Sequence, residues 1–302
     1  MQIAIVTINY NSAENTIKLL ESLKNQTNKE FEVIVVDNNS NDVNRLMDYQ
    51  TSKTNIIYLK NDRNLGYSGG NNIGIKKALE NGADWIFLLN NDTWVKSSFM
   101  AQLRVNLSPS TGSWQESKED LPAVQTGIIG LAIDEGDRTA FAGKIEWLKP
   151  TLPHITNSDF VSQNYCYAIG GAMLIHKSVF DKMDLLDENY FLYFEDADFS
   201  LRARKVGVPV SFLSDIKIYH SVSASTRKLG SPLLLRYHYR NAFYFNSKNG
   251  PWHIKLLVWP WSWIVAIKQI IKILAGKNKE QSVAILKGVG DWYAGRMGKL
   301  YS

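Results

Sequence analysis

The sequence predicts an α/β protein: a Rossmann-like, mostly parallel sheet with flanking helices, followed by a helical extension. Over about the first hundred residues, short apolar runs typical of buried strands alternate with segments of helical periodicity. After residue 244, tryptophan, aliphatic residues and lysine replace that alternation. We therefore expect a main domain over residues 1–244, with halves at 1–107 and 123–244, and a C-terminal extension over 245–302.

The first half alternates strand and helix. Strands are predicted at residues 3–8, 31–36, 55–59 and 85–89, and helices after Ser12 and over residues 71–80. Ser12 is a favourable helix cap, and Asn81-Gly82 is a favourable helix stop. Since parallel neighbours need a crossover connection, this order predicts a parallel sheet. Residues 108–122 are polar and rich in turn formers, which indicates an exposed loop.

The second half has shorter predicted elements. Strands are predicted at residues 124–133, 139–147, 165–176, 210–213 and 216–220, and a helix over residues 195–206 with Gly207 as its stop. The rest of the chain is predicted to be helical, aromatic and basic.

The composition is that of a globular protein, with 302 residues, 45% of them hydrophobic and 21% charged. A single cysteine, Cys166, excludes an internal disulfide and suits a reducing compartment. The first residues indicate a strand rather than a signal peptide, because they lack a basic segment and a cleavage site. We therefore expect a cytoplasmic protein.

The positive charge is concentrated in the extension. The net charge is +5, and nine basic residues face two acidic ones after residue 244, which leaves about −2 for the rest of the chain. A pI near 9.0 can indicate a nucleic-acid binder, but no groove-reading motif accompanies this charge. We expect no nucleic-acid partner.

Residues 252–275 are rich in tryptophan and aliphatic residues but are interrupted by Lys255, Pro260, Lys268 and Lys272. The uninterrupted apolar stretch is too short to span a bilayer. Basic aromatic helices suit a membrane surface, here the inner face of the cell membrane. Packing against the main domain, or against a second copy in a homodimer, is an equal alternative.

Asn90-Asn91-Asp92 follows the predicted strand at residues 85–89 and is the most informative motif. Open α/β sheets bind ligands at the edge where their parallel strands end. There the Asp92 carboxylate can hold a hard divalent cation, and the cation can hold a diphosphate. Asp37 ends the second strand, where it can accept from a ribose hydroxyl or a pyrimidine N3–H, or can close a turn with the residues that follow.

Glu195-Asp196-Ala197-Asp198 opens a predicted helix. Acids favour a helix start, but acids this close repel one another, which can raise a pKa into the range of a general base. Residues 64–72 are glycine-rich and open another helix, so they can approach a phosphate or form an ordinary loop. His220 ends an apolar strand and is a packed residue unless the fold brings it to Asp92.

Seven motifs follow one another in the order typical of a known enzyme family. They are residues 6–11, 35–40, 64–74, 89–93, 170–172 and 191–198, and His220 with Ser225-Thr226; Arg240-Asn241 also fits. Together they resemble glycosyltransferase family 2, of the GT-A fold, and within it the rhamnosyltransferases of bacterial polysaccharide assembly. The resemblance spans about residues 1–250, with a looser similarity in the extension.

The resemblance implies a role for each matching position. The residues that would bind the nucleotide, its ribose and its phosphates are Thr7, Asn9, Asp37, Asn64, Gly66, Asn71 and Asn91. Asp92 and His220 would hold Mg²⁺ or Mn²⁺, and Asp196 would be the catalytic base. Asn90 stands where the strict metal motif has its first acid, so we expect modest metal affinity.

The resemblance also implies an inverting glycosyltransferase. The donor would be a nucleotide-diphosphate sugar, dTDP-L-rhamnose in the first place, and the acceptor a glycan or polyprenol-linked saccharide in cell-surface polysaccharide assembly. A UDP-hexose, galactose or N-acetylglucosamine, is the alternative donor. A module that binds a nucleotide or glycan without turnover is a further alternative.

Overall fold

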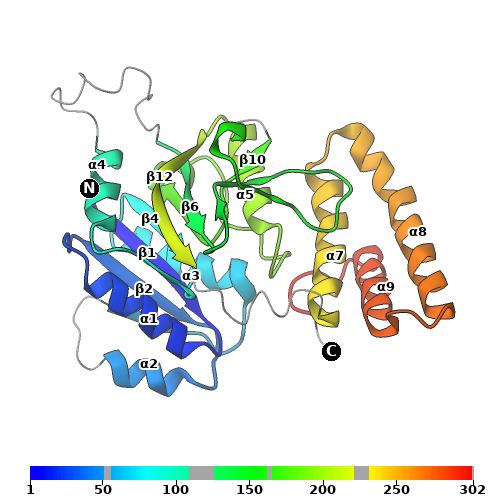
Figure 1. Ribbon diagram of the computed structural model, residues 1–302, viewed down its shortest axis with the longest axis horizontal. Coiled ribbons are helices and arrows are strands. Elements are labelled where there is room, and N and C mark those ends of the chain that lie inside the picture. The colour runs from blue at the N-terminus through cyan, green and yellow to red at the C-terminus, as the bar shows by residue number, and fades with distance from the viewer. Residues whose placement is uncertain (51–55, 109–125, 162–164, 221–230, 301–302) are drawn as a thin grey trace.

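The computed structural model describes residues 1–50, 56–108, 126–161, 165–220 and 231–300, and it confirms the α/β class (Figure 1). Its centre is a nine-stranded sheet with the order β3-β2-β1-β4-β11-β6-β12-β5, and β7 pairs with β6. A three-stranded sheet, β10-β8-β9, lies beside it in the fold. The three C-terminal helices form a separate layer at the far end of the molecule (Figure 1).

The strands are β1 (Ile3–Asn9), β2 (Phe31–Asp37), β3 (Ile56–Lys60), β4 (Trp85–Leu89), β5 (Thr93–Trp94), β6 (Ile128–Asp134), β7 (Thr139–Ala140), β8 (Ala142–Lys144), β9 (His154–Ile155), β10 (Cys166–Tyr167), β11 (Ala172–His176) and β12 (Val210–His220). The helices are α1 (Ala13–Lys24), α2 (Val43–Gln50), α3 (Gly66–Glu80), α4 (Phe99–Leu107), α5 (Glu195–Lys205), α7 (Pro232–Asn249), α8 (Trp252–Leu274) and α9 (Lys279–Tyr293), with short 3₁₀ turns η1 (Ser158–Phe160) and η2 (Lys177–Val179).

The first half of the sheet is parallel, as predicted. β1 pairs in parallel with β2 and with β4, and β2 with β3. Alternate residues of these strands belong to two separate hydrophobic cores, one on each face of the sheet. One core includes residues of α1 and α4, and the other includes residues of α3 and α5. The three parallel strands β1, β2 and β4 therefore end at one edge, with polar residues just beyond their buried runs.

The glycines of α3 allow close packing of this helix on the sheet. The helix begins at Gly66, not at Asn71 as predicted, so most of the glycine-rich segment is helical. A Cβ at Gly70 would lie 3.0 Å from Ile8 Cδ1, and one at Gly74 would overlap the Val6 side chain. The glycine content thus reflects contact between helix and sheet as much as any approach to a ligand.

The second half differs from the prediction in its strand boundaries. The segment predicted as one strand over residues 165–176 forms two, β10 and β11, separated by the turn at Gly170 and Gly171. The two strands predicted over residues 210–220 form one strand, β12, whose register shifts between Leu213 and Lys217. Such a bulge keeps the strand continuous while it changes direction. Most of the loop predicted at residues 108–122 lies outside the described residues.

The C-terminal region forms three packed helices, and the boundary that we predict at residue 244 lies inside α7. Phe243 of α7, Val258 and Val265 of α8, and Ile285 and Val289 of α9 form their common core. α8 is continuous through Pro260. Within the described residues it is a candidate membrane span by length and composition, although Lys255, Lys268 and Lys272 interrupt its apolar residues as predicted.

Candidate active site

The parallel register of β1 and β2 places Asn9 directly opposite Asp37. Asn9 Nδ2 donates to Asp37 Oδ1 at 2.8 Å, and the backbone N–H of Ser40 donates to Asp37 Oδ2 at 2.9 Å. Asp37 therefore closes a turn with the residues that follow it, which is one of the two roles that the sequence allows it. Each carboxylate oxygen can accept a further hydrogen bond, so a contact from Asp37 to a nucleotide stays a prediction.

Thr16 of α1 links two of the predicted residues and was not itself predicted. Asn91 Nδ2 donates to Thr16 Oγ1 at 2.9 Å, and Thr16 Oγ1 donates to Asn9 Oδ1 at 3.0 Å. The available signal was a threonine on the buried face of an amphipathic helix. Thr7 is fully buried on β1, and its hydroxyl has no hydrogen-bond partner within the described residues.

The loop before α3 is fixed by nearby side chains and by the backbone of the loop that precedes Asp196. Gly66 has a φ of +74°, Asn64 Oδ1 accepts from its N–H at 2.8 Å, and Asn38 Nδ2 donates to its carbonyl at 2.8 Å. The N–H of Tyr67 donates to the Phe191 carbonyl at 2.6 Å. The N–H groups of Gly66 and Tyr67 thus have protein acceptors and are not free for a phosphate, while contacts from the rest of this segment to a donor stay a prediction.

Asp92 and His220 meet at the site edge, as the metal prediction requires. β5 pairs with β12 so that Thr93 lies opposite His220, and His220 Nε2 lies 3.1 Å from Asp92 Oδ2. The hydrogen bond to the Asp92 carboxylate raises the pKa of His220 above its ordinary value, although burial opposes this effect. Ser225 and Thr226, which the resemblance groups with His220, lie outside the described residues.

This pair fits a divalent cation that is shared with a substrate. Carboxylate oxygen and imidazole nitrogen are both ligands of such ions. Within the described residues, no group of three or more histidine, cysteine or acidic side chains could hold a metal ion. A cation here would be held by these two side chains together with diphosphate oxygens and water, much as Mg²⁺ is usually held by one or two carboxylates, substrate phosphates and water. Asn90 supplies no carboxylate, and its amide packs against Gly171.

Asp196 lies at the start of α5, and two backbone groups hold its carboxylate. Oδ2 accepts from the N–H of Gly170 at 3.0 Å, and Oδ1 accepts from the N–H of Ala197 at 2.8 Å. Burial raises the pKa of Asp196 to about 6, although these N–H donors act in the opposite direction. An oriented carboxylate with this pKa is deprotonated near neutral pH and is still basic enough to take a proton.

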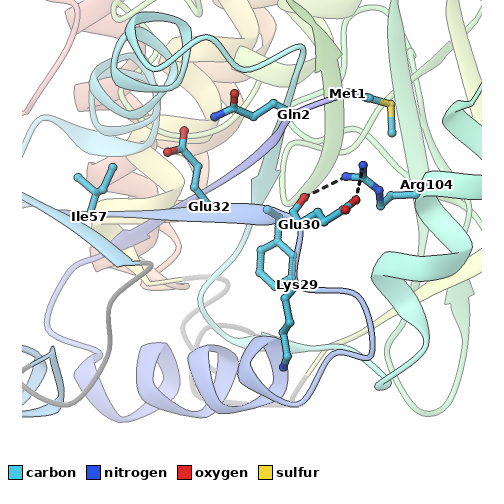
Figure 2. Close-up of a pocket in the computed structure, with 8 residues that line it drawn as sticks. Met1, Gln2, Lys29, Glu30, Glu32, Ile57 and Arg104 are labelled. Carbon is cyan, nitrogen blue, oxygen red and sulfur yellow. Dashed lines mark hydrogen bonds and ion pairs between the residues drawn. The ribbon is translucent and has the colours of Figure 1, made fainter.

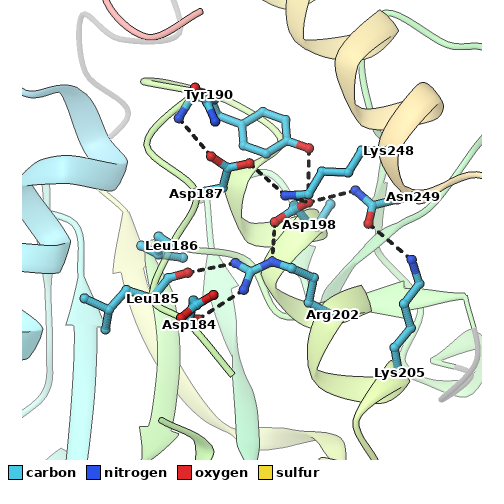
Figure 3. A network of polar contacts seen from close by, with 12 residues as sticks. Asp184, Leu185, Leu186, Asp187, Tyr190, Asp198, Arg202, Lys205, Lys248 and Asn249 are labelled. Carbon is cyan, nitrogen blue, oxygen red and sulfur yellow. Dashed lines mark hydrogen bonds and ion pairs between the residues drawn. The ribbon is translucent and has the colours of Figure 1, made fainter. Parts of the chain in front are cut away.

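The other two acids of the cluster have different environments. Asp198 is fully buried and receives hydrogen bonds and ion pairs from Arg202, Lys248 and Asn249 (Figure 3). It therefore anchors α5 to α7 and is no candidate for proton transfer. Burial and then the charge of the neighbouring Asp196 hold the pKa of Glu195 well above its ordinary value, and the Glu195 side chain is buried.

Tyr67 is a further site residue that the sequence did not single out. A Cβ at Gly170 would lie 3.1 Å from Tyr67 Oη and 3.3 Å from Asp196 Cβ, so Tyr67 and Asp196 border the same glycine. Burial and then the charges of Glu195, Asp196 and Asp92 hold the pKa of Tyr67 well above its ordinary value. Its hydroxyl is therefore a donor near the acidic cluster, and it is within electrostatic reach of Asp92.

The loop before Asp196 is strained and is held from behind by α7. Phe191, Tyr193 and Phe194 have φ values of 62°, 72° and 73°, a left-handed region that bulky side chains rarely adopt. Arg240, fully buried, donates to the Tyr190 carbonyl at 2.9 Å. Asn241 Nδ2 donates to the carbonyls of Tyr190, Leu192 and Tyr193. Backbone strain that the surroundings maintain in this way is typical of functional sites.

A separate hollow lies at the opposite edge of the sheet, at the amino ends of β1 and β2 (Figure 2). Gln2, Lys29, Glu32 and Arg104 are among its lining residues, and Arg104 pairs there with Glu30 at 2.7 Å. None of the predicted site residues lines it. Because ligands of open α/β sheets bind where the strands end, this hollow is not the candidate site.

The chain is similar to known glycosyltransferases. Residues 4–106 match the model of the family described as Glycosyl transferase family 2. The chain is 26% identical over 242 residues to the low-salt glycan biosynthesis hexosyltransferase Agl10 of Haloferax volcanii, which covers 80% of this chain and 74% of that protein. It is 27% identical over 266 residues to the dTDP-rhamnosyl transferase RfbF of Shigella flexneri, and the match covers 84% of this chain and 81% of that protein.

A further relative and a solved structure extend the comparison. The N-acetylglucosaminyl-diphospho-decaprenol L-rhamnosyltransferase of Mycobacterium tuberculosis is 22% identical over 311 residues, covering 94% of this chain and 97% of that protein. The crystal structure of GalNAc-T7 with UDP, GalNAc and Mn²⁺ has a TM-score of 0.58 at 13% identity, covering 82% of this chain and 50% of that chain. Residues 4–106 thus resemble glycosyltransferase family 2, the relatives named here are glycosyltransferases, and the chain has the GT-A fold of the solved glycosyltransferase structure.

Proposed function

We propose that this chain is an inverting glycosyltransferase in which Asp196 is the catalytic base and Asp92 and His220 hold a divalent cation. The observation that carries the proposal is the environment of Asp196. Its carboxylate is oriented by two backbone N–H groups, has a pKa raised to about 6, and lies on a strained loop that α7 supports. Of the three acids in its cluster, Asp196 alone is half-buried rather than buried, and Asp198 is already held in ion pairs with Arg202 and Lys248.

The reaction is a single displacement. Asp196 takes the proton from an acceptor hydroxyl as the hydroxyl oxygen attacks the anomeric carbon of the donor sugar. The bond between that carbon and the diphosphate oxygen breaks, and the nucleoside diphosphate leaves from the opposite face. One displacement inverts the anomeric centre, and no covalent bond to the protein forms. Base catalysis of this kind contributes about a hundredfold or more to the rate.

The leaving diphosphate carries negative charge that must be neutralised. A cation bound by Asp92 and His220 would supply that positive charge and fix the diphosphate in place. The Tyr67 hydroxyl, which stays protonated, can donate to a substrate oxygen at the same site. Thr7, Asn9, Asp37, Asn64, Gly66, Asn71 and Asn91 are proposed to bind the rest of the donor.

We favour dTDP-L-rhamnose as the donor. Two relatives that match most of this chain are named as rhamnosyltransferases, one of them for dTDP-rhamnose. The pyrimidine is also supported by Asp37, since a carboxylate can accept from N3–H of thymine or uracil. A UDP-hexose is the second candidate, because another relative is named as a hexosyltransferase and the structure of GalNAc-T7 contains UDP.

The proposed acceptor is a glycan or polyprenol-linked saccharide used in cell-surface polysaccharide assembly. One relative, similar over nearly its whole length, is named for a decaprenol-diphosphate acceptor. A lipid-linked acceptor would place the enzyme at the cytoplasmic face of the membrane.

A donor screen tests this function. Binding of dTDP, UDP and GDP sugars is measured by the shift in thermal unfolding with Mn²⁺ present, because a ligand that binds the folded state stabilises it. Turnover is then followed by nucleoside diphosphate release, and product configuration by NMR. We expect pyrimidine donors to bind and the product to be inverted. Binding without hydrolysis or transfer would instead identify a non-catalytic module, and binding of purine donors alone would contradict the donor assignment.

A further inference from the structure

The outer face of α8 is a continuous apolar surface that the rest of the described protein leaves exposed. Its members are Trp252, Leu256, Leu257, Trp259, Trp263, Ile264, Ile267, Ile270, Ile271 and Leu274. Their exposed fractions run from 47% at Leu257 to 82% at Leu274. Single exposed apolar residues are ordinary on protein surfaces, but a contiguous set on one helix marks an interaction site.

The opposite face of α8 is fully occupied within the protein. Ile254, Val258, Ser262, Val265 and Gln269 recur every three or four residues and are buried against α7 and α9. Ser262 Oγ lies 2.7 Å from Tyr293 Oη, and Ser282 Oγ donates to Gln269 Oε1 at 3.1 Å. At about 100° per residue, the outer face lies directly across the helix from this stripe. The inner face therefore holds the helix in place, and no described residue covers the outer face.

Lysines border the outer face on both sides. At about 100° per residue, Lys255 lies along one margin, and Lys268 and Lys272 lie along the other. Lys277 lies in the turn to α9, Lys279 is the first residue of α9, and α8 itself contains no acidic residue. An apolar stripe with tryptophans and a basic border is the pattern of a helix that lies in the interface of a lipid bilayer.

We propose that the outer face of α8 docks the enzyme on the surface of an anionic membrane, with the helix parallel to the bilayer. Tryptophan and isoleucine enter the headgroup region, and the bordering lysines contact anionic lipid headgroups. This inference deepens the proposed function, because it names the surface that would bring the site to a lipid-linked acceptor. It can be tested without any donor or acceptor.

Surface docking fits the structure better than a spanning helix. α8 is bound along its inner face to α7 and α9, and both of these helices carry buried charged groups, such as Arg240 and Asp291. Crossing the bilayer would carry these charges into hydrocarbon or separate α8 from its partners. Pro260 also has no N–H for the carbonyl of Leu256, a group that water at the interface can satisfy and hydrocarbon cannot.

A second copy of the chain is a less suitable occupant. Two outer faces in contact would bring lysine borders together, and α8 offers no acid to pair with them. An anionic bilayer satisfies the apolar face and the charges together.

Co-sedimentation with vesicles tests the proposal on the full chain. Vesicles of neutral lipid are compared with vesicles that contain anionic lipid, at low and high salt. One variant is Trp263→Glu with Ile267→Glu, and its matched control is Val105→Glu, an equally exposed apolar position on α4. The other is Lys255→Gln with Lys268→Gln and Lys272→Gln, and its control changes the exposed Lys76, Lys149 and Lys182 to Gln. Thermal unfolding and nucleotide binding confirm that each variant is folded.

We expect binding that needs anionic lipid and is lost at high salt. The triple lysine variant should bind about a hundredfold more weakly, which corresponds to about 1 kcal/mol per lysine near an anionic surface. The Trp263 and Ile267 variant should bind at least about tenfold more weakly, and both controls should match the unchanged protein.

Three results would overturn the inference. The protein could stay in the supernatant with anionic vesicles at low salt. It could be a dimer in buffer that Trp263→Glu with Ile267→Glu converts to a monomer, which would make the face a subunit interface. It could resist release by high salt and alkaline carbonate, which would indicate a spanning helix. Absence of sugar transfer with intact vesicle binding would count against the proposed function alone.

Discussion

Asn241 Nδ2 donates to the backbone carbonyl of Leu192 at 2.7 Å, so α7 directly supports the loop that leads to Asp196. The same amide reaches the carbonyls of Tyr190 and Tyr193, and the loop contains three bulky residues with left-handed φ. Strained backbone persists only where its surroundings hold it. The position of the proposed base therefore depends on a side chain that touches no substrate.

Replacing Asn241 tests this dependence. Asn241→Leu should lower the free energy of unfolding by about 2 kcal/mol, because buried carbonyls lose their donor, and it should also lower kcat. Asn246→Leu is the matched control: Asn246 is equally buried on α7, but it binds Leu148 and Ala242, not the loop. Urea titration and steady-state kinetics at low temperature should show similar destabilisation and a fall in kcat for Asn241→Leu alone. Equal kcat in both variants would refute a positioning role.

Gly66 and Gly207 both have a φ of +74°, so alanine substitutions at the two positions distinguish the cost of left-handed backbone from the cost of a steric overlap. In Gly207→Ala the added Cβ has no neighbouring atom within 4 Å. This change should therefore lower the free energy of unfolding by about 1–2 kcal/mol, from the left-handed backbone alone. Gly66→Ala would also overlap the backbone and ring of Phe191. We expect greater destabilisation and weaker nucleotide binding, measured by thermal unfolding and calorimetry. Identical effects of the two changes would show that the close contact is unimportant.

The metal assignment predicts a specific loss. Nucleotide should bind more tightly with Mg²⁺ or Mn²⁺ than in EDTA, and Asp92→Ala or His220→Ala should remove most of that difference. Asp134→Ala, which removes a carboxylate from the end of β6, should leave the difference intact. Isothermal titration gives all these affinities. If unchanged protein and Asp92→Ala bind nucleotide equally with and without metal, Asp92 is not a metal ligand.

The raised pKa of Asp196 predicts a cost in stability. The folded protein holds this proton more tightly than the unfolded chain, whose aspartate pKa is about 3.9. Its contribution is therefore present at low pH and is lost as the pH rises through about 6. Asp196→Asn should raise the unfolding temperature at pH 8 and change it little at pH 4. A lower unfolding temperature at pH 8 would indicate that the charged carboxylate is stabilising.

The sequence predicts some features well because their cause is local. β1, β2 and β4 are found within a residue of the predicted bounds, since each contains at least four consecutive apolar residues that are buried on both faces. The start of α3 is wrong because glycine usually indicates a loop, whereas here it admits Ile8 and Val6 against the helix. That reason lies in β1, far along the chain, and no local pattern reveals it.

The same limit applies to the site. Asp196 and Asp198 are alike in sequence, and only the tertiary partners Lys248 and Asn249 show that Asp198 is structural. The approach of His220 to Asp92 depends on the pairing of β12 with β5, which strand patterns do not encode. Tyr67 belongs to the site because it borders the turn at Gly170, which lies in the other half of the domain.

The pH dependence of sugar transfer by unchanged protein and by Asp196→Asn tests the central claim most directly. For the unchanged protein, kcat/KM should rise tenfold per pH unit below about 6 and level off above it. Asp196→Asn should lose about a hundredfold or more in kcat and lose this inflection, with nucleotide affinity nearly unchanged. Near-normal turnover in Asp196→Asn, with the inflection near pH 6 still present, would contradict the assignment of Asp196 as the base.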